Sequence, residues 1–331
     1  MEYGLLDYSS INGKFNIGDY VQSLAAKQYL PRVDKMINRE KLSHYDGSEV
    51  KVILNGWFMH SPENWPPSEK ILPLFTSFHI NRPFISRMLT PNAISYMKNV
   101  GSIGCRDYYT AEILEAKGID SYYSSCLTTT LGRTWSHENT GTNTNVLFVD
   151  VMHAVPKLSD FKDFPLRYTL SHFKNGNVPR SFQKNRYMNE LLSTIPADLQ
   201  GKVEVIENSI DGENISVESR FSMAEEYLSK LAKANMVVTS RIHCALPCLA
   251  LGTPVVFIKY GQTSMSNIYR FRGIIDHMNV IDLDGDMKRH GFKSNFLDVA
   301  DIDWSNPPAN PRTFEKCSSA LAKQCLDFAN S

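Results

Sequence analysis

One segment, residues 236–258 (MVVTSRIHCALPCLALGTPVVFI), limits the folds open to this chain more than any other. It begins with a short apolar run, passes through the polar Thr239 and Ser240 into a second apolar stretch that stops at Gly252, and ends in a third apolar run. Short apolar runs rich in valine and isoleucine predict buried strands, whereas an apolar stretch between a polar residue and a glycine predicts a helix. The segment therefore predicts a strand, a helix and a second strand, the repeating unit of a parallel sheet.

Two basic side chains, Arg241 and His243, fall in the turn between this first strand and the helix. Open α/β sheets bind ligands at the carboxyl ends of their strands, and the free N–H groups at a helix start favour an anion. A guanidinium adds a forked cation and an imidazole adds a titratable donor. The same pattern also fits a surface arginine and a histidine bonded to a backbone carbonyl, so both interpretations stand at this point.

Strands and helices alternate on both sides of a polar stretch, residues 135–145 (WSHENTGTNTN), which is typical of a linker. With 331 residues, the chain exceeds the length at which one core usually keeps growing. We therefore expect two α/β domains, residues 1–138 and 144–331, with a terminal helix over 314–329 that packs on the body of its domain. The other strands are expected at 1–8, 51–55, 77–80, 146–151, 203–207 and 279–283, and the other helices at 20–30, 108–117, 185–194 and 223–234.

Charge and hydropathy exclude several classes of protein. Lys plus Arg and Asp plus Glu number 35 each, which argues against a globally charged nucleic-acid binder. The opening residues show no basic segment followed by an apolar one, and no apolar run reaches the ~20 residues that a membrane helix needs, so we expect a cytoplasmic protein. The six cysteines form no CxxC pair, and no HExxH motif is present, so we expect neither a metal nor a cofactor.

Further charged residues fall at the ends of predicted strands. Asp19 follows a glycine in the first turn, Arg106 and Asp107 precede the helix at 108–117, and Lys259 follows the last strand of the opening segment. Strand ends from two domains would face a common cleft, which is the default position of an active site. Each carboxylate also fits the cap of the helix that follows it, and Lys259 also fits a solvated surface charge.

An ordered set of short motifs suggests a family. The motifs are Asn16-Ile17-Gly18-Asp19, Asn55-Gly56-Trp57, Gly104-Cys105-Arg106-Asp107 leading to Gly118-Ile119, Ser125-Cys126-Leu127-Thr128 and Ser240-Arg241-Ile242-His243. In this order, over residues 12–258, the chain resembles the polysaccharide pyruvyl transferase family. The resemblance implies two Rossmann-like domains with a cleft between them, similar to the B-type glycosyltransferase fold. It also implies transfer of pyruvate from phosphoenolpyruvate to a sugar as a ketal.

The resemblance also implies roles on the donor side. In family members the Ser-Arg-x-His turn is associated with the donor, which carries over to Ser240, Arg241 and His243. We expect Arg241 to bind a donor anion, and His243 to act as the acid or to bond the phosphate. Arg106 and Lys259 are expected as secondary anion contacts.

On the acceptor side, we expect Asp19 or Asp107 to activate the sugar hydroxyl. Asn55 and Trp57 are the expected acceptor contacts, although many members have a glycine-rich run here instead of one glycine and two aromatic residues. Trp57 either stacks on a sugar face or packs its own loop.

Two alternatives stay open: a nucleotide-sugar glycosyltransferase of the same two-domain fold, and a non-catalytic glycan-binding protein. The partners expected are phosphoenolpyruvate and a glycan or lipid-linked oligosaccharide, with peripheral membrane association through a lipid-linked acceptor.

Overall fold

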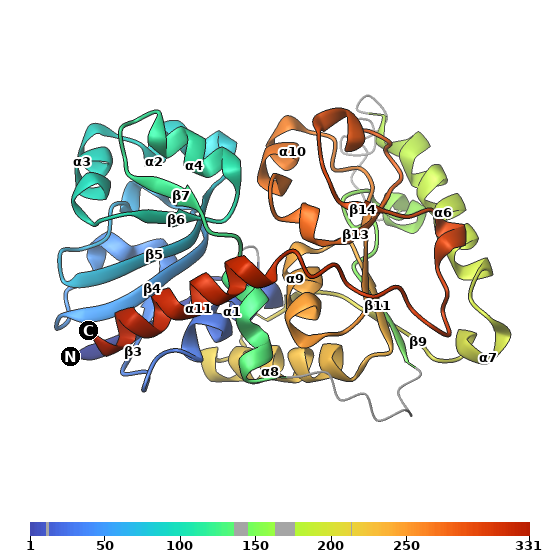
Figure 1. The fold of residues 1–331 in the computed structure, drawn as a ribbon, viewed down its shortest axis with the longest axis horizontal. Helices are drawn as coiled ribbons and strands as arrows, with labels where there is room; N and C mark the ends of the chain where they lie inside the picture. Colours follow the sequence, from blue (N-terminus) through green and yellow to red (C-terminus); the bar gives the residue numbers. More distant parts are fainter. Residues whose placement is uncertain (11–12, 136–144, 163–175, 213) are drawn as a thin grey trace.

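The chain folds around two parallel sheets of six strands each, which lie side by side in Figure 1. The computed structural model describes residues 1–10, 13–135, 145–162, 176–212 and 214–331. The architecture confirms the predicted fold class, a mixed α/β protein with two parallel sheets. We call residues up to 135 the first half and residues from 145 onward the second half.

The first sheet has the strand order β3-β1-β4-β5-β6-β7. Its strands are β1 (Glu2–Asp7), β3 (Lys35–Asn38), β4 (Val50–Phe58), β5 (Ile71–Ile80), β6 (Ile103–Cys105) and β7 (Ser121–Tyr123). Strands β4 and β5 both run farther than the sequence predicted, because they stay paired from Val50 opposite Ile71 to Phe58 opposite Ile80. Strand β5 is extended at its start and ends where the sequence predicted, with His79 next to its last residue at the carboxyl edge of the sheet.

The second sheet has the order β14-β13-β12-β11-β8-β9. Its strands are β8 (Val146–Val149), β9 (Val203–Ile206), β11 (Met236–Thr239), β12 (Val255–Lys259), β13 (Asn279–Asp282) and β14 (Asn295–Phe296). The central strands are continuous apolar runs because parallel sheets are buried on both faces. The predicted strand–helix–strand unit is present, since β11 and β12 pair in parallel on either side of α9 (Ile242–Leu251).

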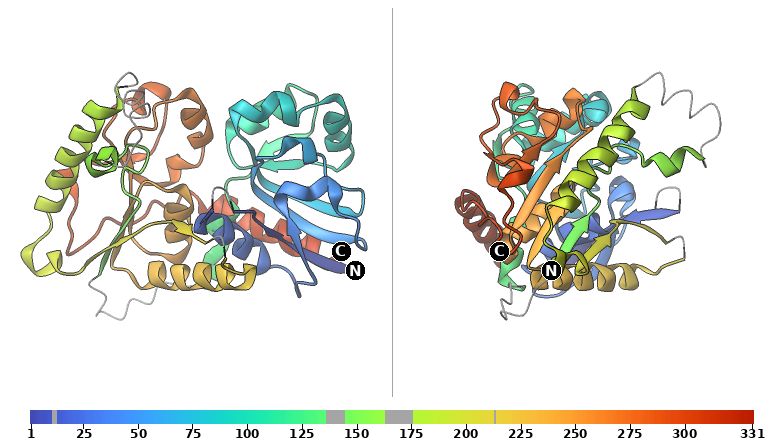
Figure 2. Two further views of the ribbon diagram at one scale, coloured as in Figure 1. Left: turned by 180° about the vertical axis from the view of Figure 1, so that it is seen from behind. Right: turned by 90° about the vertical axis from the view of Figure 1, so that its right-hand side faces the viewer.

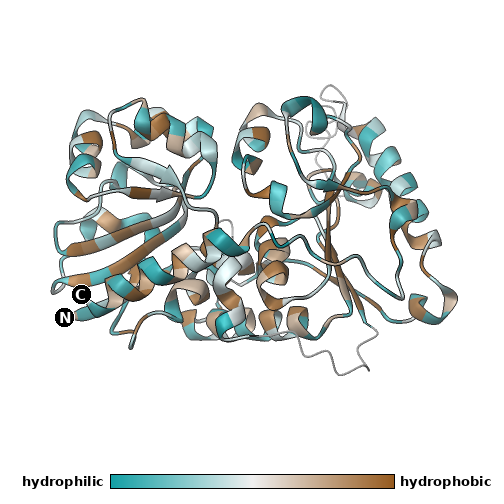
Figure 3. Ribbon diagram, in the orientation of Figure 1, coloured by the Kyte–Doolittle hydropathy of each residue, from teal (hydrophilic) through white to brown (hydrophobic). Residues whose placement is uncertain are grey.

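Helices cover both sheets, with apolar residues facing the strands and polar residues outward (Figure 3). Besides α9, they are α1 (Ile17–Lys27), α2 (Ile85–Met88), α3 (Pro91–Asn99), α4 (Tyr108–Glu115), α6 (Asn177–Ser193), α7 (Ala197–Gln200), α8 (Val217–Lys233), α10 (Met265–Phe271) and α11 (Glu315–Asn330). Short 3-10 turns lie between them, including η1 (Arg39–His44) and η4 (Leu127–Arg133).

Among the contacts that join the two halves are a two-stranded ribbon and a pair of helices, both seen from behind in Figure 2. The short β2 (Lys14–Asn16) pairs antiparallel with β10 (Ser209–Asp211), so each half contributes one strand to a common ribbon. Helices α1 and α8 pack together, with the rings of Tyr20 and Phe221 5.1 Å apart. Arg220 on α8 also donates to Tyr20 Oη at 3.1 Å. The first turn of α1 is therefore held against the second half.

The last helix, α11, crosses back to the first half (Figure 1). Tyr3 Oη donates to the carbonyl of Ala329 at 2.8 Å, and Lys51 Nζ donates to the carbonyl of Phe328 at 2.9 Å. The sequence had grouped this helix with residues 144–331, whereas its contacts with β1 and β4 attach it to the first sheet. Its apolar side, with Leu321 and Cys325 buried, packs against η4 and β5 of the first half and joins a core cluster that contains residues of both halves.

Most of the predicted linker, residues 136–144, lies outside the described residues. Among the residues that the structure describes, no helix combines the length and the apolar character needed to cross a membrane.

Candidate functional site

A cavity of ≈ 340 Å³ lies where the carboxyl ends of the two sheets meet. Its wall is strongly basic. Five cations line it, Lys14, Arg39, Arg106, Arg241 and Arg270, together with three histidines, His60, His79 and His243, and a single acidic residue, Asp19. Such a wall attracts an anion, because the basic groups outnumber the one carboxylate within a small volume.

The fold explains why these side chains converge. Arg106 follows directly after β6, His79 is near the end of β5, and Arg241 follows directly after β11. Parallel strands end at one edge, so each sheet presents its strand-end residues to the same opening. Asp19 comes from the first turn of α1 and Arg270 from α10.

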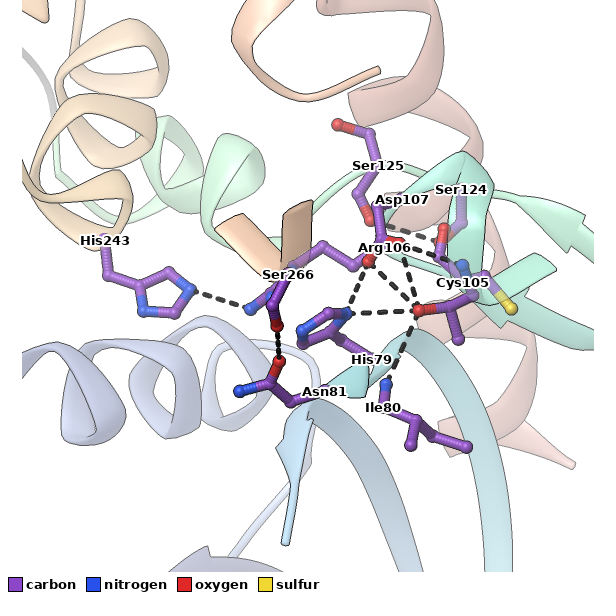
Figure 4. A network of polar contacts seen from close by, with 11 residues as sticks. His79, Ile80, Asn81, Cys105, Arg106, Asp107, Ser124, Ser125, His243 and Ser266 are labelled. Carbon is purple, nitrogen blue, oxygen red and sulfur yellow. Dashed lines mark hydrogen bonds and ion pairs between the residues drawn. The ribbon is translucent and has the colours of Figure 1, made fainter. Parts of the chain in front are cut away.

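Arg106 and His243 meet across the two halves. Arg106 Nη1 and His243 Nε2 are 3.4 Å apart (Figure 4). Arg106 is only 1% exposed, and its Nε has no hydrogen-bond partner among the described residues. Burial lowers the pKa of the Arg106 guanidinium. A buried cation with an open donor is suited to an anionic ligand that restores its solvation.

Two more arginines, Arg270 and Arg241, lie beside Arg106 in the cavity wall. Arg270 also has a buried Nε without a partner in the described chain, and burial together with Arg106 lowers its pKa to about 10. Arg241 is held by Asp150, with Nε and Oδ2 2.6 Å apart. The repulsion among these guanidinium groups is relieved when an anion binds between them.

Burial lowers the pKa of His243 well below its usual value, and the nearby cations, Arg106 first, lower it further. The imidazole is therefore neutral near pH 7 in the free site. Its place at the start of α9 depends on a glycine in the first half, since a Cβ added to Gly18 would lie 3.0 Å from His243 Cβ. The Asn16-Ile17-Gly18-Asp19 motif thus lets α1 approach α9 closely.

Asp19 lines the cavity and is not the residue that caps α1. Asn16 is the N-cap of α1 and accepts from the N–H of Gly18 at 3.0 Å. Asp19 Oδ1 accepts from Gln22 Nε2 at 3.2 Å. Burial raises the pKa of the Asp19 carboxyl, which makes it a better proton acceptor once ionised.

Asp107 does not line the cavity but supports His79, which does. Asp107 caps α4 by accepting from the N–H of Thr110 at 2.9 Å, and its Oδ2 is 2.6 Å from His79 Nδ1. Burial and Arg106 lower the pKa of His79 to about 4. Burial opposes the Asp107 charge, yet His79 and Arg106 hold the pKa of Asp107 below its usual value. The expected direct role of Asp107 toward the acceptor therefore does not fit its position.

Two of the expected donor contacts also lie elsewhere. Lys259 is fully buried outside the cavity wall, 3.0 Å from Asp284 and in contact with Asp286. Its charge is already compensated by these carboxylates. Ser240 donates to the carbonyl of Ile258 at 2.5 Å and accepts from the N–H of Met152 at 2.8 Å. It fixes the turn that presents Arg241.

The two residues expected to contact the acceptor lie in different places. Trp57 lines the cavity, whereas Asn55 is buried outside it and donates to the carbonyl of Gln22 at 2.9 Å, tying β4 to α1. The Trp57 ring is already contacted by the Arg39 guanidinium and, at 4.2 Å between centroids, by His60.

Among the basic residues of the cavity wall, five were not assigned to the site from the sequence: Lys14, Arg39, His60, His79 and Arg270. His79 had a usable signal, because it lies near the carboxyl end of a predicted strand. Nothing in the sequence around Arg39 marked it as a site residue. No group of three or more His, Cys, Asp or Glu suited to a metal ion occurs in the described part of the chain.

The comparisons with known proteins give one family. Residues 16–262 match the family model described as polysaccharide pyruvyl transferase. The match ends before Arg270 but contains His79, Arg106 and the turn with Arg241 and His243. No curated protein matches the chain significantly.

Proposed function

The chain belongs to the polysaccharide pyruvyl transferase family and is a transferase, and on that basis we propose the reaction that its cavity performs. It transfers the pyruvate unit of phosphoenolpyruvate to a sugar of a polysaccharide or of its lipid-linked precursor. The product is a pyruvate ketal, and inorganic phosphate is released. The finer likeness to B-type glycosyltransferases belongs to the same proposal, with the donor in the cleft between two Rossmann-like domains.

The observation that carries this proposal is the meeting of Arg106, Arg241 and Arg270 in one cavity. Phosphoenolpyruvate carries a carboxylate and a phosphate on adjacent atoms, so it needs several donors within a small volume. Guanidinium groups bind both anions through paired hydrogen bonds. Two of the three arginines have buried Nε donors that lack a partner in the described chain.

The chemistry needs two proton transfers. A proton adds to the methylene carbon of the donor, and a sugar hydroxyl attacks the neighbouring carbon. Phosphate then leaves with its oxygen, and a second hydroxyl of the sugar closes the ketal. The two protons lost by the hydroxyls balance the one gained by the methylene carbon and the one carried away by phosphate. An acid, a base and cations around the phosphate are therefore required.

The cavity residues supply these roles in our proposal. Asp19, whose pKa is raised, takes the proton of the attacking hydroxyl. His243 is neutral in the free site, but a phosphate between it and the arginines would raise its pKa and make it the proton donor. His79, held by Asp107, is a second imidazole within the same wall. The scheme requires no cofactor or metal, and we place the enzyme in the cytoplasm, with membrane association through a lipid-linked acceptor.

Isothermal titration tests the donor. Saturable binding of phosphoenolpyruvate, weakened in Arg106→Gln and unchanged in the exposed Arg312→Gln, is the expected result. Binding of a nucleotide sugar in place of phosphoenolpyruvate would replace the proposal with a glycosyltransferase. Release of phosphate on adding acceptor, with a ketal in the product's NMR spectrum, tests the reaction itself; glycan binding without turnover would indicate a binding protein.

A further inference from the structure

Arg39 is the least expected residue in the cavity wall. It begins η1 directly after β3 and is only 2% exposed. Its guanidinium carbon lies 4.7 Å from the ring centroid of Tyr8 and 4.9 Å from that of Trp57. Both rings line the same cavity, so the guanidinium plane is held between them at the cavity wall. An arginine stacked in this way has little freedom to turn toward another partner.

The hydrogen bonds of this arginine are incomplete. Arg39 Nε donates to Glu40 Oε1 at 2.7 Å, and Glu40 Oε2 accepts from the N–H of Ser61 at 2.8 Å. Arg39 Nη1 is buried and has no partner among the described residues, and the same is true of Trp57 Nε1. Two buried N–H donors of cavity-lining residues therefore lack an acceptor among the described residues, which favours a ligand that brings oxygen atoms to them.

The balance of charges around Arg39 differs from that of the arginine cluster at Arg106. Glu40 compensates Arg39, and burial lowers the pKa of the neighbouring His60, so that imidazole adds no charge near pH 7. Asp19 lies within electrostatic reach of Arg39, His60, Glu40 and also Arg106. The carboxylate of Asp19 thus interacts both with the compensated Arg39 and with the cationic Arg106.

We propose that the cavity wall around Arg39 is the acceptor subsite and that it takes an uncharged sugar, whose hydroxyl oxygen accepts from Arg39 Nη1 while a neighbouring hydroxyl faces Asp19. The inference rests on the proposed function, since it names the substrate class for the second reactant. An acidic sugar is disfavoured, because its carboxylate would meet Asp19 while the charge of Arg39 is already compensated by Glu40. Trp57 acts here through its ring edge and by holding Arg39, since its face is covered.

The test compares pairs of sugars that differ at C6, where one has a neutral hydroxymethyl group and the other a carboxylate. Wild-type protein is titrated with the methyl glycoside of a neutral hexose, one each of the gluco, galacto and manno series, and with the matching uronates, with and without phosphoenolpyruvate. We expect at least one neutral glycoside to bind more tightly than its uronate. In Arg39→Gln its affinity should fall roughly 10-fold or more, the loss of a hydrogen bond to a charged donor, while phosphoenolpyruvate affinity stays within about 2-fold.

Two further variants complete the test, one a second substitution of Arg39 and the other a control at an arginine outside the cavity. Arg39→Lys preserves the charge beside Glu40 but lacks the fork, so it should also lose the neutral sugar even where Arg39→Gln unfolds. Arg133→Gln is the matched control, because Arg133 stacks on Tyr29 at 5.5 Å but is exposed and outside the cavity. It should bind both ligands like the wild type.

Several results would overturn the inference: tighter binding of the uronates, no binding of any neutral glycoside, wild-type sugar affinity in both Arg39 variants, or equal loss of sugar and phosphoenolpyruvate. Failure of the donor proposal gives a different pattern. In that case the neutral glycoside binds through Arg39, whereas phosphoenolpyruvate does not bind the wild type at all.

Discussion

Asp107 Oδ2 lies 2.6 Å from His79 Nδ1, in a contact where both side chains are buried. Since an ionised carboxylate only accepts, His79 donates from Nδ1, which leaves Nε2 as the lone-pair nitrogen of the neutral ring. The same Asp107 caps α4 through Thr110. One carboxylate thus sets both the helix start and the tautomer of a histidine in the cavity wall.

These two roles can be separated by Asp107→Asn. Asparagine caps a helix about as well as aspartate, so the melting temperature should change little. The amide no longer fixes the tautomer of His79, and turnover should fall by about 10²-fold or more if His79 transfers a proton. Steady-state rates and thermal unfolding are measured side by side. Full activity in Asp107→Asn would leave His79 no role in proton transfer.

The protonation of His243 should depend on the donor. Its pKa is lowered in the free protein, so it is neutral above that pKa and takes up a proton only as pH falls. A bound phosphate offsets the field of Arg106 and Arg270, so the pKa of His243 should rise when phosphoenolpyruvate is added. NMR of the imidazole nitrogens measures the shift. If His243 is the acid, His243→Ala loses about 10²–10⁴-fold in turnover; an unchanged pKa at saturating donor would contradict its role.

Asp19 predicts an acidic limb in the pH profile. Its pKa is raised, so the ionised base is present above that pKa and is lost as pH falls through it. The limb of kcat/KM should therefore lie above the ~4 of an ordinary aspartate. Asp19→Asn should remove about 10²–10⁴-fold of the rate while phosphoenolpyruvate still binds. A limb that persists unchanged in Asp19→Asn would assign it to another group.

Arg270 lies outside the matched family segment, so its contribution to donor binding needs its own test. Arg270→Gln removes a guanidinium with an unpaired buried donor. The affinity for phosphoenolpyruvate should fall by about 10-fold or more, as expected for a charged hydrogen bond. Arg312→Gln, an exposed arginine paired with Glu315, should bind as the wild type does. Equal affinities in the two variants would exclude Arg270 from the donor site.

Lys259 should matter for stability rather than for binding. It is buried among Asp282, Asp284 and Asp286, and Lys259→Met would leave these carboxylates without their cation. The cost should be about 3–5 kcal/mol of unfolding free energy. By contrast, Lys323→Met breaks an exposed pair with Asp327 and should cost under ~1 kcal/mol. Denaturant unfolding compares the two; equal losses would contradict the structural role.

Local sequence patterns predicted much of the fold. The apolar runs and the glycine after α9 predicted β11, α9 and β12 to within a few residues, because these features report burial and helix ends directly. The short strands β2 and β10 had no such signal. Each has only three residues, and their pairing arises from the contact between halves, which sequence periodicity does not encode.

For the site residues, too, the sequence predicted some positions and not others. Arg106, Arg241, His243 and Asp19 lie in the cavity, as expected from their places at strand ends and in the first turn of α1. Lys259 has the same kind of position at the end of β12, yet three aspartates that follow β12 in the chain enclose it. The position of a residue at a strand end predicts where its side chain begins. It does not predict which charged residues from elsewhere in the chain pair with that side chain.

The return of α11 to the first sheet has a consequence for synthesis of the chain. Leu321 and Cys325 belong to a core that also contains Leu5 and Leu6 of β1, so the contacts of α11 with the first half form only after nearly all of the described chain has been made. Until then, the surface that α11 covers stays exposed. A fragment cut at the predicted linker, such as residues 1–138, would leave this apolar surface open to water and prone to aggregation.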